Sequence, residues 1–360
     1  MKPEVAVLRS VSALAGLSEG WDALSAPFAT PLLDHDWFLS VAESLHDEAD
    51  LRVVTVRQSG RLLAVAPLAL DRRRRRLLLL GAATLYEPAG VLVSSDESLR
   101  VLASAVAGLG DATILQRLPS RSLAARTLRD VLRGHALTIV RTTAPSYGIP
   151  TTKPWPEYVD TLSARTRRRL ALAAERASRL SDVVEIDEVS PTHVTVDGFF
   201  DLLMATEHAG WKGRGGSSLS ARGDLERFYR RYARRAAGKN QLRVTMLRIG
   251  GDVAAIEFAV QAHGRRWGLK LGYDERFAPC APAIQVVHAS IRAAFEQGLR
   301  TYEFLGSAES WQERWKPEAR EYVTAAVYPF RLRALVAAAQ DAAGSVTRRL
   351  HFHREPTVAL

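Results

Sequence analysis

One carboxylate in an apolar stretch is the first candidate for chemistry in this sequence. Glu257 stands in AAIEFAV, a run that is otherwise apolar. A carboxylate in such a run either faces a cleft or carries a large cost of desolvation, and clefts with perturbed acids are typical of functional sites. The pattern favours Glu257 as a general base, and the alternative is a structural ion pair with Lys270 or Arg248.

Three further reactive side chains follow within 25 residues. Tyr273 can protonate a departing thiolate, whereas Asp274 is either a second catalytic group or a cap for the loop that it opens. Cys280 precedes a helix, which favours a thiolate, but packing is the commonest role of a lone cysteine. We therefore expect Tyr273 and Asp274 to take part in catalysis and Cys280 to be no nucleophile.

The elements around these residues follow from hydrophobic spacing. Residues 266–273 alternate as in a half-buried strand, and the prolines in 274–282 end that strand. Apolar residues at helical spacing then predict a helix that ends at Gly298, and its unpaired N-terminal amides suit a phosphate. A second strand follows. The residues that carry these patterns are Trp267, Leu269, Leu271 and Tyr273, then Ile284, Val287, Ile291 and Phe295, then Tyr302 and Phe304.

An internal repeat links the two halves of the chain. LRVVTVRQSGRLLAVAPLAL at Leu51 aligns without gaps with LRVTMLRIGGDVAAIEFAVQ at Leu242. Each copy predicts a hairpin of two strands with its turn at a glycine. Ala66 occupies the place of Glu257 in the first copy, and only the second copy is followed by the strand, loop and helix described above. We therefore expect the second half of the chain to bind the donor substrate, whose phosphate would lie at the start of that helix.

Composition limits the class of protein. The 360 residues are 47% hydrophobic, enough for two cores, and one cysteine excludes a disulfide framework. No basic-then-apolar leader and no apolar run near 20 residues is present, so we expect a soluble cytoplasmic protein with no membrane partner. Prolines and a glycine interrupt all periodicity in residues 142–156 and predict a domain boundary there.

The positive charge gathers in the second half. The net charge is +10, with 17 basic and 15 acidic residues in 1–150 and 32 and 24 in 151–360. Residues 164–180, ARTRRRLALAAERASRL, predict an amphipathic basic helix. This helix either attracts a polyanion, namely coenzyme A, an acidic carrier protein or the acceptor arm of a tRNA, or is simply a solvated face. The other run, Arg72 to Arg76, indicates the charged tip of a hairpin.

Several motifs together carry a family resemblance. YDERF, the proline-bounded loop after it and YEFLGSAESWQERW resemble the C-terminal signature of the CelD-like branch of the GNAT acyltransferase superfamily. HAGWKGRGGSSLS, from His208, resembles a loop of the same branch, and PFATPLLDHDWFLS matches it with Pro31 and Trp37. The resemblance spans nearly the whole chain.

The resemblance implies an α/β (α+β) fold. Two tandem GNAT-like units, each with a mixed and mainly antiparallel central sheet flanked by helices, would be distantly similar to Fem-type aminoacyltransferases. We place the N-terminal unit in residues 1–150, on the acceptor side of the cleft, and the donor-binding unit in residues 151–330. Residues 331–360 form a helical tail in this scheme.

The resemblance also assigns site residues. Backbone amides near Leu271 to Tyr273 would stabilise the oxyanion, and the donor would contact this strand and the loop after it, at Leu271, Gly272, Pro279, Cys280, Ala281 and Ala283. The pocket for the acceptor amine would include His208, Trp211 and Arg214 from the aromatic and basic loop. It would also include four residues outside that loop, namely Glu87, Glu303, Trp311 and Arg314. No metal site is expected, because His351 and His353 have no further ligands nearby.

Two departures from the family pattern bear on the donor. Cys280 stands where the branch often has glycine, and Gln312 where Fem-like relatives carry a lysine that faces the transferred group. We therefore predict an N-acyltransferase that moves an acyl group from acyl-CoA or a carrier-bound phosphopantetheine to a small-molecule or saccharide amine by direct attack. The alternatives are a Fem-like enzyme that uses aminoacyl-tRNA and a non-catalytic protein that binds CoA or a partner.

Overall fold

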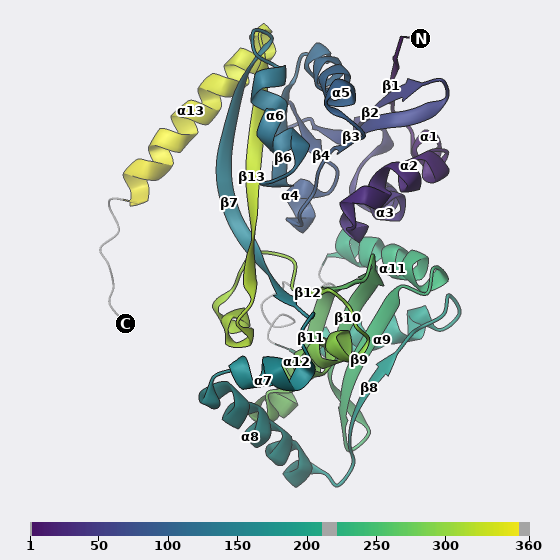
Figure 1. The fold of residues 1–360 in the computed structure, drawn as a ribbon, viewed down its shortest axis with the longest axis vertical. Helices are drawn as coiled ribbons and strands as arrows, with labels where there is room; N and C mark the ends of the chain where they lie inside the picture. Colours follow the sequence, from purple (N-terminus) through teal and green to yellow (C-terminus); the bar gives the residue numbers. More distant parts are fainter. Residues whose placement is uncertain (1, 211–221, 353–360) are drawn as a thin grey trace. The chain divides into compact units, whose positions relative to one another are not determined.

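The computed structural model describes residues 2–210 and 222–352, with side chains to residue 343 (Figure 1). The chain forms two units that interleave in the sequence. Unit 1 comprises Met1–Leu24, His46–Thr143 and Tyr322–Leu360, and unit 2 comprises Ser25–Leu45 and Ala144–Glu321. The boundary between the units falls inside two long strands, β7 (Ala136–Pro150) and β13 (Glu318–Pro329). The functional roles assigned to residues 1–150 and 151–330 stay predictions.

Unit 1 is a sheet in the order β1-β2-β3-β4-β6-β13, with β5 on β3. Its core lies between this sheet and two helices, α5 and α6, and includes Leu68, Leu102 and Leu118. The strands are β1 (Glu4–Leu8), β2 (Leu51–Gln58), β3 (Arg61–Asp71), β4 (Arg76–Leu79), β5 (Leu92–Val93) and β6 (Ala112–Pro119). The helices are α1 (Val11–Ala15), α2 (Ser18–Ser25), α4 (Ala82–Leu85), α5 (Asp96–Gly108), α6 (Leu123–Val131) and α13 (Leu332–Phe352). The predicted hairpin tip at Arg72 to Arg76 is confirmed as the β3–β4 turn.

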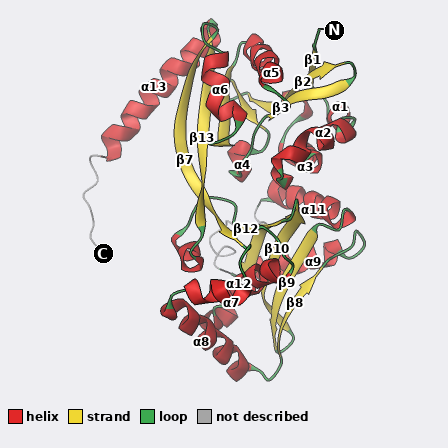
Figure 2. Ribbon diagram, viewed as in Figure 1, coloured by secondary structure: helices red, strands yellow, loops and turns green. Residues whose placement is uncertain are grey.

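The strands of unit 2 pair in the order β7-β12-β11-β10-β9-β8, with helices on both faces (Figure 2). Its strands are β8 (Val184–Val189), β9 (Leu242–Ile249), β10 (Asp252–Ala262), β11 (Arg265–Tyr273) and β12 (Thr301–Glu303). Its helices are α3 (His35–Leu45), α7 (Trp155–Thr161), α8 (Ala164–Leu180), α9 (Val196–His208), α11 (Gly223–Gly238) and α12 (Pro282–Glu296). Its 3-10 helices include η5 (Glu275–Cys280) and η6 (Ser310–Trp315).

The internal repeat is confirmed in the register of the hairpins. Leu51 pairs with Ala69 in β2–β3, and the equivalent Leu242 pairs with Val260 in β9–β10. Each hairpin carries one bulge at the equivalent place, next to Val56 in the first and next to Ala255 in the second. Register and bulge together indicate a duplicated unit.

The expectation that only the second half continues with strand, loop, helix and strand is wrong. In unit 1, β4 pairs parallel to β6 over three residues, and α5 lies between them in the chain. In unit 2, β11 pairs parallel to β12 over three residues, and α12 lies between them. A gapless alignment cannot follow this part of the repeat, because the turn before β4 is two residues longer than the turn before β11.

A helix from the N-terminal segment completes unit 2. Trp37 of α3 packs edge-on against Phe228 and Tyr232 of α11, with ring centroids 5.0 and 4.9 Å apart. Arg235 of α11 donates to Glu43 of α3 at 2.9 Å. Aromatic contacts of this kind, together with a bidentate ion pair, fix the helix in place. Across the described residues, no helix is both long and apolar enough for a membrane span.

Candidate active site

A notch opens in the sheet of unit 2 where β11 leaves β12. The two strands pair only at residues 265–267 and 301–303, whereas β11 runs on beside β10 to Tyr273. Leu269 is the extra residue of a bulge in β11, between Gly268 and Lys270. A bulge increases the local twist of a strand, so it turns β11 away from β12 at this point. In the described part of the chain, no strand pairs with the outer edge of residues 268–273, so its backbone groups lack the partners that a neighbouring strand would supply.

Two helices cover opposite faces of the notch strand. Leu271 packs toward α12, in the cluster that contains Val286 and the buried Cys280. Gly272 faces α9, where a Cβ atom on this residue would lie 3.1 Å from the Glu207 backbone nitrogen. A Cβ atom on Gly210 would lie 2.7 Å from the Tyr273 carbonyl oxygen. The absence of side chains at these two glycines therefore lets the end of α9 rest directly on the backbone of the notch.

A methyl group at Gly210 is expected to distort the notch. The Gly210→Ala variant should lose about 1–3 kcal/mol of unfolding free energy, as overpacked sites do, because its Cβ meets backbone rather than a flexible side chain. Gly198→Ala is the matched control, since a Cβ atom there has nothing within 4 Å, and removing a helical glycine should stabilise by about 0.5–1 kcal/mol. Urea unfolding of both variants measures the difference. Equal stabilities would contradict the close approach.

Glu257 lies at the closed end of the notch, on the face that α12 covers. Its side chain is 2% exposed, and Tyr302 of β12 donates a hydrogen bond to one carboxyl oxygen. The other oxygen has no hydrogen-bond partner among the described residues. Burial raises the pKa of Glu257 to about 7, although hydrogen bonds from Ser290 and Tyr302 act to lower it. Neither alternative partner pairs with it, since Arg248 bonds to the Gly251 carbonyl.

The Glu257–Tyr302 pair touches the first residue of the open edge. A Cβ atom on Gly268 would lie 3.0 Å from the Tyr302 hydroxyl and 3.3 Å from Oε1 of Glu257. Gly268 directly follows Trp267, the last residue of β11 that pairs with β12. The carboxyl group with the raised pKa is thus positioned at the point where the two strands separate.

Arg266 anchors the polar cluster behind this pair, and the sequence analysis did not single it out. Its side chain is fully buried, and it donates to Glu188 of β8 at 2.9 Å and to the Ser290 carbonyl of α12 at 3.1 Å. Gln261 and Gln297 accept from it at 3.1 and 3.3 Å. Arg265 and Lys270 of the same strand are also basic, so the sequence held no signal that set Arg266 apart. The cluster ties the sheet to α12 on the face that carries Glu257.

The predicted donor residues lie along one continuous path. Tyr273 ends β11 half-buried, and Asp274 caps η5 by accepting from the Arg276 backbone and pairing with its guanidinium, both at 2.8 Å. Asp274 therefore has the capping role that the sequence allowed. Burial raises the pKa of the Cys280 thiol, which disfavours a thiolate. The structure brings together, from β11 through η5 to the first turn of α12, Leu271, Gly272, Pro279, Cys280, Ala281 and Ala283.

The predicted acceptor residues are more scattered. His208 is exposed at the end of α9, and Glu303 is buried and paired with Arg320 at 3.3 Å. In η6, Trp311 donates to Glu309 at 2.7 Å, and Arg314 donates to the Trp311 carbonyl at 2.7 Å. Glu87 follows α4 in unit 1, and Trp211 and Arg214 lie outside the described residues. The roles of these residues stay predictions.

The structure assigns to two further side chains local roles that the sequence patterns could not assign. Glu207 of α9 is 4% exposed and packs against Gly272, on the face of the notch strand opposite to Glu257. Gln312 is 4% exposed and accepts from the Glu309 backbone at 2.9 Å, so it caps η6. The residue that replaces the family's lysine is thus part of the local fold.

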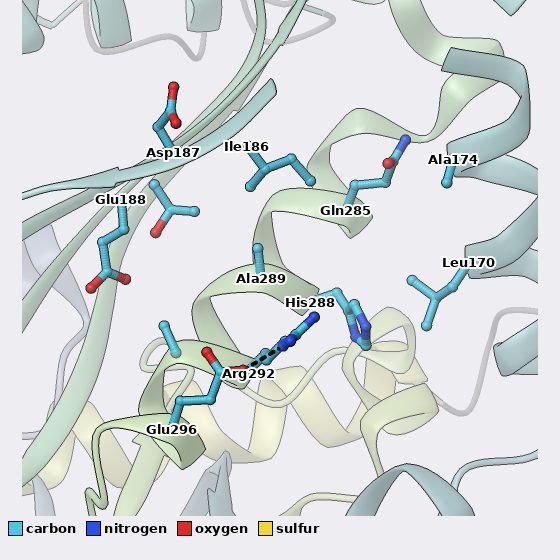
Figure 3. A pocket seen from close by; sticks show the side chains of 12 residues that line it. Leu170, Ala174, Ile186, Asp187, Glu188, Gln285, His288, Ala289, Arg292 and Glu296 are labelled. Atoms are coloured by element: carbon cyan, nitrogen blue, oxygen red, sulfur yellow. Dashed lines mark hydrogen bonds and ion pairs between the residues drawn. The ribbon is translucent and has the colours of Figure 1, made fainter. Parts of the chain in front are cut away.

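A separate pocket of about 520 Å³ lies between α8, the strands β8 and β9, and α12 (Figure 3). Leu170 and Ala174 of α8 form one wall, and His288 and the Arg292–Glu296 pair of α12 form another. Burial lowers the pKa of His288 to about 4, so its ring is neutral at pH 7. This pocket contains none of the predicted site residues.

Comparison with known proteins identifies the fold. Residues 164–316 match the family model of the acetyltransferase (GNAT) domain. No curated protein matches the chain. Among solved structures, FemX has a TM-score of 0.60 at 12% identity, covering 94% of this chain and 99% of that chain.

Two further solved structures have the same tandem architecture. The C-terminal domain (DUF2156) of a putative lysylphosphatidylglycerol synthetase from Agrobacterium fabrum has a TM-score of 0.57 at 12% identity, covering 92% of this chain and 96% of that chain. A tandem GNAT protein from the clavulanic acid pathway has a TM-score of 0.50 at 12% identity, covering 91% and 98%. The domain match and the shared tandem fold agree, and residues 164–316 of this chain form an acetyltransferase (GNAT) domain.

Proposed function

We propose that the protein is an N-acyltransferase that moves an acyl group from a phosphopantetheine thioester to an amine by direct attack. The observation that carries this proposal is the open edge of residues 268–273, which begins at the Glu257–Tyr302 pair and leads through η5 to the start of α12. An extended phosphopantetheine arm can pair with the free backbone groups of such an edge. The phosphate then lies at the N-terminal end of a 15-residue helix, where the dipole favours negative charge.

The reaction needs an oxyanion donor and a proton acceptor. A backbone amide of residues 271–273 would donate to the thioester oxygen, and one such donor is worth about 100-fold to 1000-fold. The amine nitrogen bonds to the carbonyl carbon and the C–S bond breaks. Glu257 takes the proton of the amine, and its pKa of about 7 suits a base at neutral pH. Tyr273 returns a proton to the leaving thiolate.

Two features favour a thioester donor over aminoacyl-tRNA. Gln312 is occupied as the cap of η6, in the place where Fem-like relatives have a lysine toward the transferred group. Cys280 is buried with a raised pKa, so no covalent acyl-enzyme is needed or supported. The acceptor in this proposal is a small-molecule or saccharide amine.

The proposal predicts thiol release that depends on both substrates. Incubation of the protein with acetyl-CoA and a panel of amines, with released CoA measured by a thiol reagent, should give turnover only where an amine that fits is present. The control contains each amine without enzyme. Absence of CoA binding, together with a salt-dependent mobility shift of tRNA, would contradict the proposal.

A further inference from the structure

Five of the six arginines of α8 lie on one side of the helix. Residues spaced by three and four lie on the same face, and Arg165, Arg168, Arg169, Leu172, Arg176 and Arg179 share this relation. The opposite flank holds Ala171, Ala174 and Ser178 together with Arg167 and Glu175. We call the first group the arginine flank. Its residues are exposed, and Leu172 is 36% exposed.

The arginine flank borders the path of the proposed donor. Arg176 donates to the carbonyl of Pro279, in the η5 loop that leads to α12, at 3.1 Å. Burial lowers the pKa of Arg314 in η6, and the positive charge of Arg169 on α8 acts in the same direction. The pocket of Figure 3 lies on the other side of α8, where Leu170 and Ala174 line it.

Much of this charge has no counter-ion within the protein. In the residues that the structure describes, Arg165, Arg168 and Arg169 have no carboxylate partner, whereas Arg167 on the opposite flank pairs with Asp160 at 3.6 Å. At 1.5 Å per residue the flank is about 21 Å long. A row of this length exceeds what the phosphates of one coenzyme A molecule can contact, and it suits a larger polyanion.

The chemistry of the flank favours an acidic protein over a nucleic acid. No aromatic side chain lies on it, although proteins that bind unpaired nucleotides usually stack the bases on aromatic rings. Instead Leu172 stands among the arginines, and two more apolar side chains, Leu180 and Val183, are 58% and 51% exposed at its C-terminal end. Apolar residues within a charged rim are the pattern of protein interfaces.

We propose that the arginine flank of α8 docks an acidic carrier protein, which delivers the acyl group on its phosphopantetheine arm into the notch. This inference rests on the proposed function and names the donor for the same site. The bonds made and broken are those of the thioester aminolysis above, and the thiol product stays on the carrier.

The test compares one acyl group on two donors. An acidic bacterial acyl carrier protein loaded with an acetyl group and acetyl-CoA are assayed with the same amine, using the wild type and Arg165→Glu/Arg168→Glu. Reversing two docking charges should lower kcat/KM for the carrier by about 10-fold to 100-fold through KM, and leave kcat/KM for acetyl-CoA within about two-fold. Retained acetyl-CoA activity also shows that the variant is folded.

Single variants on the two sides of the helix give a matched control. Arg168→Glu and Arg167→Glu make the same charge change at adjacent positions, and only Arg168→Glu should weaken the use of the carrier. Raising the salt concentration should reduce carrier activity more than CoA activity. Equal losses with both donors, or no loss with the carrier, would overturn the inference.

The outcomes separate the two proposals. Turnover of acetyl-CoA without turnover of the carrier would retain the acyltransferase and overturn the docking surface. Failure of both thioesters would overturn the proposed function itself. Transfer from aminoacyl-tRNA that is lost in Arg165→Glu/Arg168→Glu would reassign the flank to RNA.

Discussion

Glutamine in place of Glu257 is expected to lower kcat by about 100-fold or more and, at the same time, to stabilise the protein at pH 8. Both effects have one cause. The carboxyl group is buried with one oxygen lacking a partner, and burial raises its pKa to about 7. The glutamine amide has a similar shape and can still accept the bond from Tyr302, but it neither ionises nor takes a proton.

The sign of the stability effect follows from linkage. The pKa of Glu257 is about 7 in the folded protein and near its usual 4.5 in the unfolded chain, so the folded state holds the proton more tightly between these values. The stabilisation is full below pH 4.5 and is lost as the pH rises through 7, by about 3 kcal/mol in total. Glu257→Gln should abolish this contribution to the pH dependence.

The unfolding free energy of the wild type and of Glu257→Gln, measured in denaturant at pH 5 and pH 8, tests the predicted pH dependence of stability. The kcat of both proteins over the same pH range tests the role of Glu257 as the base. Glu207→Gln is the comparison variant for the other face of the notch strand. Unchanged kcat in Glu257→Gln across the pH range would remove Glu257 as the base. A pH dependence of stability equal to that of the wild type would show that the carboxyl group is not buried in its neutral form.

Replacement of Arg266 with methionine is expected to cost about 1–3 kcal/mol of unfolding free energy, the usual loss when buried acceptors lose their hydrogen-bond donor. Its guanidinium satisfies Glu188, Ser290, Gln261 and Gln297 at once. Although burial acts in the opposite direction, the hydrogen bond and charge of Arg266 lower the pKa of Glu188. Methionine has a similar length but donates no hydrogen bond, so these acceptors lose the guanidinium, and Glu188 keeps only the bond from Gln297 at 2.8 Å.

Arg265→Met provides the control for this variant. Arg265 is the neighbouring residue of β11, is half-buried, and has no ion pair in the described structure, so its replacement should change the stability by less than about 1 kcal/mol. Arg266→Lys should not rescue the loss, because lysine lacks the planar fork that contacts several acceptors. Equal unfolding midpoints of Arg266→Met and Arg265→Met in urea would contradict the role of the cluster.

The local elements of the site were predictable because each depends on near neighbours in the sequence. The hairpins at Leu51 and Leu242, the η5 loop and the helix after it follow from alternation, prolines and helical spacing. The basic helix was predicted as residues 164–180 and is observed as Ala164–Leu180. Such patterns report one element at a time.

The long-range contacts were not predictable from these patterns. Tyr302 reaches Glu257 across 45 residues because β12 pairs parallel to β11, and no local spacing encodes that register. The contact of Trp37 with α11 spans about 190 residues and assigns α3 to unit 2. Gln312 was correctly noted as a departure, but its role as a cap depends on the geometry of η6.

The most direct test of the central claim is the mass of the product formed when both donor classes compete. The protein is incubated with equal concentrations of acetyl-CoA and aminoacyl-tRNA and with an amine acceptor that supports turnover, and the acceptor is analysed by mass spectrometry. The account predicts an acceptor heavier by one acetyl group and an equal amount of free CoA. An acceptor that gains only an aminoacyl group, with acetyl-CoA unconsumed, would contradict it.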